Sequence, residues 1–140
     1  VVIKLAEPSD LFCVYEIVNE YSDSEVISRE RVKSYLRDLL YLKGAFMATY
    51  NDVPIGGVAG VFSPCMFRDE MFFCVMFFYI KDGYRHLTKQ FLKELELVLT
   101  PTACNRIVFG FMSSKHGKKY ARFLRMAGYS ELETHYSKAL

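Results

Sequence analysis

The chain has 140 residues and a formal net charge of +2, from 18 basic and 16 acidic side chains. This length corresponds to about one domain, so we predict a single domain over residues 1–140 that needs no stabilising disulfide or metal. Hydrophobic residues make up 51% of the chain, with 12 Phe and 10 Tyr, which excludes a disordered or fibrous protein. The near balance of charge gives no signal for nucleic acid or a membrane.

The cysteines and histidines give no sign of a metal site. No CxxC pair occurs and no histidine lies at ligand spacing from a cysteine, so we predict no metal and a reducing cytoplasm as the location. The apolar stretch Met71–Ile80 is too short to cross a bilayer. The segment Val1–Leu5 lacks the pattern of a signal peptide.

The first forty residues predict a strand followed by two helices. Val1–Leu5 is typical of a short strand, and Ser9 or Asp10 is suited to cap the first turn of a helix that continues to Tyr21. Apolar residues with helical spacing also mark a second helix, with Ser28 as its cap. Lys43-Gly44 ends that helix. The first apolar stripe is Val14, Ile17, Val18 and Tyr21, and the second is Val32, Tyr35, Leu36, Leu39 and Leu40.

The period then changes to that of strands. Ala45–Tyr50 and Val53–Phe62 flank Asn51-Asp52, which predicts a tight turn between two strands. Gly56-Gly57 and Gly60 indicate a bulge or a close backbone approach in the second of them. Met71–Ile80 is almost unbroken in apolar character and predicts a central strand that is covered on both faces.

The last sixty residues predict two helices and two strands. A turn at Asp82–Arg85 leads into a helix that ends before Pro101, and Ile107–Met112 is a strand. A helix follows around Tyr120, closed by Gly128, and Tyr129–Leu140 completes the chain as a strand, in one or two pieces. The order predicts an α/β fold, with a central mixed sheet flanked by about four helices.

Two segments resemble motifs of the GNAT superfamily of acyl-CoA-dependent N-acetyltransferases. Phe77–Arg85 is similar to its strand and turn, V-x-P-x-x-R, and Ala121–Tyr129 with Tyr136–Lys138 to its second half, A-x-x-L-Y-x-x-x-G-F … Y-x-K. A third segment, Ile55–Val61, resembles the GNAT-type proteins encoded by tailed phages. The resemblance covers roughly Ala45 to Leu140, and it implies the GNAT fold.

The resemblance implies that acetyl-CoA is bound beside the central strand, with its pyrophosphate at the start of the next helix. Aligning Ile80 with the motif's Val places Arg85 on its Arg, and then Thr88 and Gln90 stand where the family has glycines. Aligning by the helix stripe places Gly83 there instead, and neither register restores the glycines. A solvated basic helix start is the alternative interpretation. The implied binding residues are Tyr79, Ile80, Arg85, His86, Leu87, Thr88 and Lys89.

The resemblance also implies two catalytic groups. The tyrosine that protonates the leaving thiolate in many GNAT enzymes corresponds to Leu124, and Tyr120 lies one turn earlier on the same helix face. The strand carboxylate that acts as a base corresponds to Cys74, and Glu70 lies four residues earlier on the same strand face. Tyr120 as acid and Glu70 as base are therefore the candidates, against a core tyrosine and a solvated carboxylate.

Two functions remain open from the sequence. One is an enzyme that transfers an acetyl group from acetyl-CoA to an amine, carried by a small molecule or a protein. The other is a catalytically silent, GNAT-like phage protein with a structural or binding role, acting in the host cytoplasm or the virion. Its partners would be a second copy or a virion assembly. The overall pattern favours the enzyme, whereas the missing glycines and Leu124 favour the silent protein.

Overall fold

The computed structural model describes residues 1–10, 15–16, 29–110, 115–132, 136 and 138–140. Their contacts divide the chain into two compact units, Val1–Gly110 and Phe111–Leu140. The helix predicted between Asp10 and Tyr21 lies mostly outside the described residues. The single-domain prediction for residues 1–140 stays a prediction.

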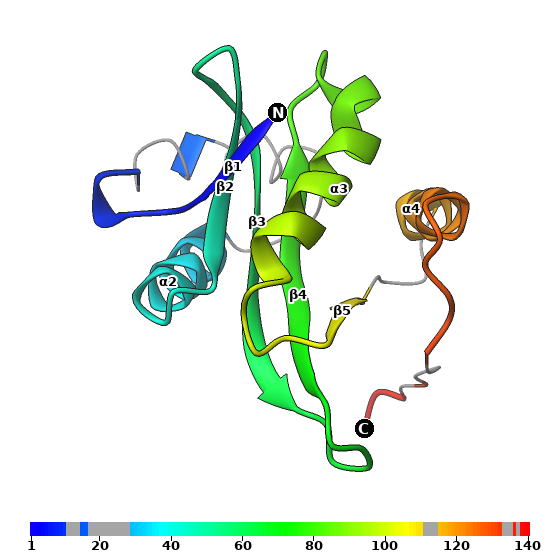
Figure 1. The fold of residues 1–140 in the computed structure, drawn as a ribbon. Helices are drawn as coiled ribbons and strands as arrows, with labels where there is room; N and C mark the ends of the chain where they lie inside the picture. The colour runs from blue at the N-terminus through cyan, green and yellow to red at the C-terminus, as the bar shows by residue number, and fades with distance from the viewer. Residues whose placement is uncertain (11–14, 17–28, 111–114, 133–135, 137) are drawn as a thin grey trace. The chain divides into compact units, whose positions relative to one another are not determined.

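The first unit contains a five-stranded mixed sheet in the order β1-β2-β3-β4-β5 (Figure 1). The first four strands pair antiparallel with their neighbours, and β4 pairs parallel with β5. This confirms the predicted mixed sheet. The strands are β1 (Val2–Leu5), β2 (Ala45–Tyr50), β3 (Val53–Pro64), β4 (Met71–Ile80) and β5 (Arg106–Phe109).

Two helices cover opposite faces of this sheet. On one face, α3 packs its apolar stripe on alternate residues of the central strands, and on the other α2 does the same. None of the helices in the described ranges is long and apolar enough to span a membrane. The helices are α2 (Arg29–Tyr41), α3 (Thr88–Leu99) and α4 (Lys115–Met126), with 3-10 turns η1 (Pro8–Asp10) and η2 (Arg85–Leu87).

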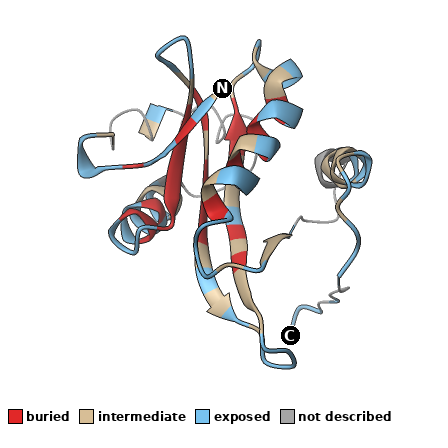
Figure 2. Ribbon diagram, viewed as in Figure 1, coloured by how far each residue is buried: buried red, intermediate tan, exposed pale blue. Residues whose placement is uncertain are grey.

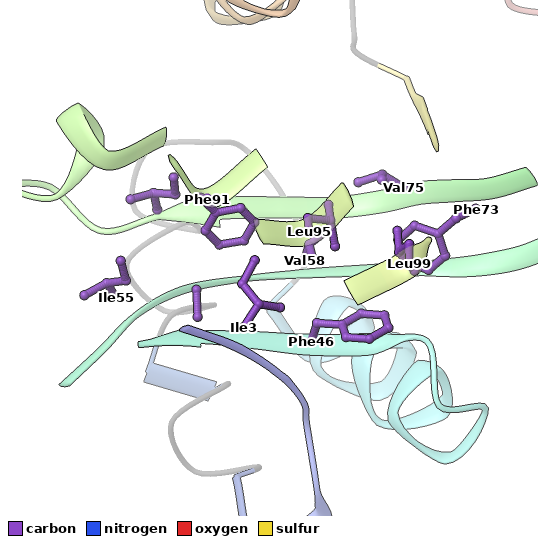
Figure 3. Close-up of a cluster of buried hydrophobic side chains, with 11 residues drawn as sticks. Ile3, Phe46, Ile55, Val58, Phe73, Val75, Phe91, Leu95 and Leu99 are labelled. Carbon is purple, nitrogen blue, oxygen red and sulfur yellow. The ribbon is translucent and has the colours of Figure 1, made fainter. Parts of the chain in front are cut away.

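The core lies between the sheet and α3, as the buried positions of Figure 2 and the close-up of Figure 3 show. Phe73 of β4 and Phe91 of α3 have no exposed surface. Alternation along β4 sends Phe73 and Val75 into this layer, and the extra residue Met76 then switches the faces, so that Phe78 and Ile80 join the layer while Phe77 packs on the α2 side. The ten-residue apolar run is thus a central strand with both faces covered over part of its length, as predicted.

Backbone geometry bears out the turn and glycine predictions for the β2–β3 hairpin. Asn51 and Asp52 have φ values of 49° and 63°, the positive pair that a two-residue type I′ turn requires. The β2–β3 and β3–β4 registers each shift once, next to Gly56 and Gly60. A Cβ on Gly60 would lie 2.3 Å from the carbonyl oxygen of Cys74, so only glycine allows the two backbones to come this close.

The second unit contains α4, which ends as predicted at Gly128. This glycine has a φ of 94°, and its N–H donates to the Arg125 carbonyl while the Tyr129 N–H donates to that of Leu124. These two bonds form a Schellman motif, which satisfies carbonyls that a helix end leaves free.

The strand predicted over Tyr129–Leu140 is wrong for the residues described there, 129–132, 136 and 138–140, none of which is in a strand. Leu132, Tyr136 and Leu140 fall on one strand face, but the positions between them on that face are polar. A strand with such a face has little apolar surface to bury, so the sequence of this segment favours pairing in a sheet only weakly.

Candidate active site

The candidate site begins where β4 and β5 separate. The two strands pair only from Phe72 to Val75 of β4, whereas the pairing of β4 with β3 continues to Ile80. Figure 1 shows β5 beside the lower half of β4 only. The β3 register skips Met76, which is therefore a bulge residue, and its side chain is 55% exposed. A bulge redirects the strand at the place where its parallel partner ends.

A tight turn links the end of β4 to α3. The Tyr84 N–H donates to the Lys81 carbonyl over 3.1 Å, and Gly83 has a φ of 88°, the value that the third position of a type II turn requires. The 3-10 turn η2 leads directly into α3, and the N–H groups of Leu87 and Thr88 donate to the Tyr84 and Arg85 carbonyls. Neither Tyr84, the N-cap of η2, nor Leu87, the N-cap of α3, makes a side-chain capping bond, so the dipole of this segment favours an anion at its start.

Basic side chains gather at this helix start. Arg85, His86 and Lys89 are all exposed, and their N–H groups are suited to donate to a pyrophosphate. Arg85 is engaged within the turn, because its guanidinium lies 2.8 Å from the Asp82 carboxylate. The buried Thr88 hydroxyl donates to the Arg85 carbonyl over 2.5 Å, so the side chain that replaces the family's first glycine folds inward.

The other predicted binding residues expose less side-chain surface to a ligand. Tyr79 and Ile80 are only 5% and 3% exposed, so contact with a ligand would have to come from their backbone groups. Leu87 is half-buried and packs against the core. The structure therefore brings the predicted cofactor residues together at one end of β4, but presents side chains mainly from Arg85, His86 and Lys89.

Glu70 lies at the other end of β4, immediately before its first residue. Its carboxylate accepts two hydrogen bonds from the Arg106 guanidinium, each 3.3 Å long. This bond lowers the pKa of Glu70, helped by the charges of Arg106 and Arg68 and opposed by partial burial. Six residues of strand separate Glu70 from Met76, about 20 Å. The base role stays a prediction, and both the distance and the pairing weigh against it.

Tyr120 belongs to α4 in the second unit and is half-buried. It lies four residues before Leu124, so the two share one face of that helix. Glu70 and the Arg85–Lys89 turn belong to the first unit. The proposed acid role of Tyr120 stays a prediction.

Three residues at this site were not predicted from the sequence: Met76, Asn105 and Arg106. The bulge at Met76 has no local sequence signal, because it depends on how β3 pairs with β4. Asn105 and Arg106 start β5 and contact the start of β4 more than thirty residues away, at Met71 and Glu70. These contacts could have been predicted only by first predicting that β4 and β5 are parallel neighbours, because parallel strands begin at the same end of a sheet.

Two other kinds of site find no support in the described ranges. They hold no group of three His, Cys, Asp or Glu side chains able to bind a metal ion. An apolar depression beside α2, lined by Leu36, Met47, Gly57 and Phe77 among others, has a volume of about 20 Å³. That is room for about one water molecule, far less than a ligand pocket needs.

Comparisons with known proteins support the fold. No protein-family model and no curated protein matches the sequence. Among solved structures, the chain is similar to a probable acetyltransferase, with 13% identity, a TM-score of 0.78 and coverage of 100% of this chain and 98% of the other. A GNAT family acetyltransferase of Staphylococcus aureus gives 14% identity and a TM-score of 0.73, with 99% and 98% covered.

An aminoglycoside acetyltransferase from an uncultured soil metagenomic sample, solved with sisomicin, gives 12% identity and a TM-score of 0.69, with 99% and 95% covered. At these identities the likeness establishes the fold alone. The chain has the α/β fold of GNAT-type acetyltransferases.

Proposed function

We propose that the chain is an N-acetyltransferase that moves an acetyl group from acetyl-CoA to an amine. The observation that carries the proposal is the end of β4: a bulge where β5 stops pairing, followed by a turn into a helix start with exposed cations and no capping side chain. An anion site that follows the last pairing of two parallel strands suits a long anionic thioester, which needs room for its chain as well as a partner for its charge.

The roles of the residues follow from their positions. Arg85, His86 and Lys89 would bind the pyrophosphate, favoured by the dipole at the start of the continuous η2–α3 segment. Acetyl-CoA, when bound, supplies an activated acyl group that a neutral amine attacks directly. Tyr120 would supply the proton that the departing thiolate takes up. The described residues offer no unpaired strand carboxylate at β4, because Glu70 is paired with Arg106, so the amine would give up its proton to water.

Two classes of acceptor fit the proposal, an amine on a small molecule and an amine on a protein. The aminoglycoside acetyltransferases among the similar structures act on small molecules, as their names state. A phage origin, an action in the cytoplasm of its host and a homodimer belong to the same proposal, on the sequence resemblance alone.

One observation favours the alternative, a catalytically silent GNAT-like protein with a structural or binding role. Asp82 places a carboxylate against Arg85, at the cation that a phosphate would need. In addition, the glycines that would let the backbone come close to phosphate are replaced by Thr88 and Gln90 in one alignment, and by His86 and Thr88 in the other. A catalytically silent protein would keep the fold but would not bind acetyl-CoA.

Calorimetric titration with acetyl-CoA separates the two functions. We expect binding by the unmodified chain and about tenfold weaker binding by Arg85→Gln, since a charged hydrogen bond to phosphate is lost. Arg37→Gln removes an equally exposed arginine from α2 and serves as the matched control, with unchanged affinity. No heat of binding at millimolar acetyl-CoA would leave the silent protein as the better proposal.

Turnover tests the proposed acid once binding is established. With a panel of amines as acceptors, Tyr120→Phe removes only the hydroxyl group and is expected to lower kcat by about a hundredfold, the usual contribution of a general acid. Acetyl-CoA affinity should stay the same in this variant. Unchanged turnover would remove Tyr120 from the mechanism while leaving the cofactor site in place.

A further inference from the structure

The parallel pair β4–β5 is fastened at one end by side chains from both strands. Arg106 of β5 donates twice to the Glu70 carboxylate, which precedes β4. Beside them, the Met71 N–H donates to the Asn105 side-chain oxygen and the Asn105 N–H donates to the Met71 carbonyl, both over 2.8 Å. We call these four residues, Glu70, Met71, Asn105 and Arg106, the basal clamp.

The basal clamp lies next to the only stretch over which β4 and β5 pair. That stretch covers four residues of each strand and ends at Val75 and Phe109. Beyond it, the Phe78 and Phe109 rings meet edge-to-face, with 5.6 Å between centroids. Because only four residues of each strand pair, the direction in which the clamp holds the start of β5 also sets where its last residue, Phe109, lies beside β4.

We propose that Glu70 and Arg106 are positioning residues, which set the orientation of β5 against β4, as far as the bulge at Met76, through the geometry of their ion pair. The use of that orientation, to bind acetyl-CoA, rests on the proposed function. The orientation itself does not. In this role Glu70 touches no substrate, so the inference replaces its assignment as a base.

Geometry favours positioning over a general contribution to stability. A bidentate pair between a planar guanidinium and a carboxylate fixes orientation as well as distance. The side chains of Arg106 and Glu70 are 40% and 27% exposed, so water weakens their attraction and leaves orientation as the main effect. The mutual pKa shifts, lowered for Glu70 and raised for Arg106 by their shared hydrogen bonds, agree with a formed pair.

Hydrogen exchange tests the clamp without any ligand. Glu70→Gln and Arg106→Gln each break the ion pair, and Glu70→Arg combined with Arg106→Glu restores it in reverse. Asp10→Asn is the matched control, because it breaks the Lys4–Asp10 pair of 3.4 Å, which involves β1. We expect the amides of Ile107–Phe109 to exchange at least about fivefold faster in both single variants, and at the original rate in the reversed pair and the control.

Kinetics with acetyl-CoA tests the purpose of the clamp. We expect KM for acetyl-CoA to rise about tenfold in Glu70→Gln while kcat changes less than about twofold, and the reversed pair to regain the original KM. A merely structural role would lower the melting temperature and leave KM unchanged, and that result would overturn the inference, as would a β5 exchange rate equal to that of the control.

The two proposals fail separately. If the unmodified chain binds no acetyl-CoA, the proposed function falls and exchange alone decides the clamp: faster exchange in Ile107–Phe109 supports it and an unchanged rate refutes it. If acetyl-CoA binds and exchange rises but KM does not move, the clamp does not position the cofactor. A large fall in kcat of Glu70→Gln at constant KM would return Glu70 to the role of base.

Discussion

Phe91 has no exposed surface, and its ring meets that of Phe78 edge-to-face with 5.1 Å between centroids. Replacing it with alanine removes the ring and leaves a cavity between α3 and β4, at a cost of about 3–5 kcal/mol. Leu97→Ala, at a 57% exposed position of the same helix, should change stability by less than about 0.5 kcal/mol. Urea unfolding measures both, and equal losses would contradict the packing of α3 on this face.

The carboxyl group of Glu70 makes a pH-dependent contribution to stability. Its pKa is lowered from 4.5 in the folded chain by the Arg106 hydrogen bonds and the charges of Arg106 and Arg68, and Cys65 lies near enough to raise the pKa of Arg106. The unfolded chain therefore binds the proton more readily, so the contribution is present above pH 4.5 and is lost as pH falls through the lower, folded value.

Comparison with Glu70→Gln isolates this contribution. Glutamine resembles the protonated acid, so the difference in unfolding midpoint between the two proteins should be constant well above pH 4.5 and shrink as pH falls through the lowered pKa of the folded state. Urea titrations at several pH values give this difference. A difference that stays constant as the acid titrates would show that charge on Glu70 is not what the pair contributes.

Among the elements, the β2–β3 hairpin has a turn whose second residue is not ideal. Asp52 adopts a φ of 63°, and glycine reaches this region without the steric cost that a Cβ brings. We expect Asp52→Gly to stabilise the chain by about 0.5 kcal/mol, the balance of relieved strain and added chain entropy. Gly83→Ala, at a φ of 88°, should act in the opposite direction, by about 1 kcal/mol. Thermal unfolding shows whether each substitution raises or lowers the melting temperature.

The sequence predicted correctly the strands whose limits are marked by residues close together in the chain. Ala45–Tyr50 and Met71–Ile80 have the predicted bounds, because a change of period and a long apolar run mark them directly. The strand predicted to end at Phe62 continues to Pro64, since Met71 pairs with Pro64 across the hairpin. That extension, like the absence of a strand from the described residues after Gly128, depends on partners that are distant in the sequence.

The candidate site shows the same difference between features set by neighbouring residues and features set by residues distant in the sequence. The grouping of the candidate anion-binding residues was predictable, because turn, basic side chains and helix start are consecutive in the sequence from Lys81 to Lys89. The sequence also placed Glu70 directly before the central strand, yet the identity of its partner was hidden. Arg106 reaches it only after α3 has crossed between two parallel strands, and such a pairing leaves no local spacing to detect.

Ligand-linked stability is the last prediction, and it concerns the whole chain. A ligand that binds only the folded state stabilises it by about 2.7 kcal/mol at a hundred times its Kd, which for this length raises the melting temperature by about 6–10 °C. Lys89→Gln should reduce that rise, because Lys89 lies in the first turn of α3, where the helix dipole and the cation act together on an anion.

Lys93→Gln is the matched control, since Lys93 is equally exposed one turn further along the helix, where the dipole effect has decayed. Thermal unfolding with and without acetyl-CoA should therefore order the three proteins as unmodified equal to Lys93→Gln, and both above Lys89→Gln. An equal loss in both variants would mean that acetyl-CoA responds to overall charge and not to the start of α3. If acetyl-CoA raises the melting temperature of none of the three proteins, the proposed enzyme function is contradicted.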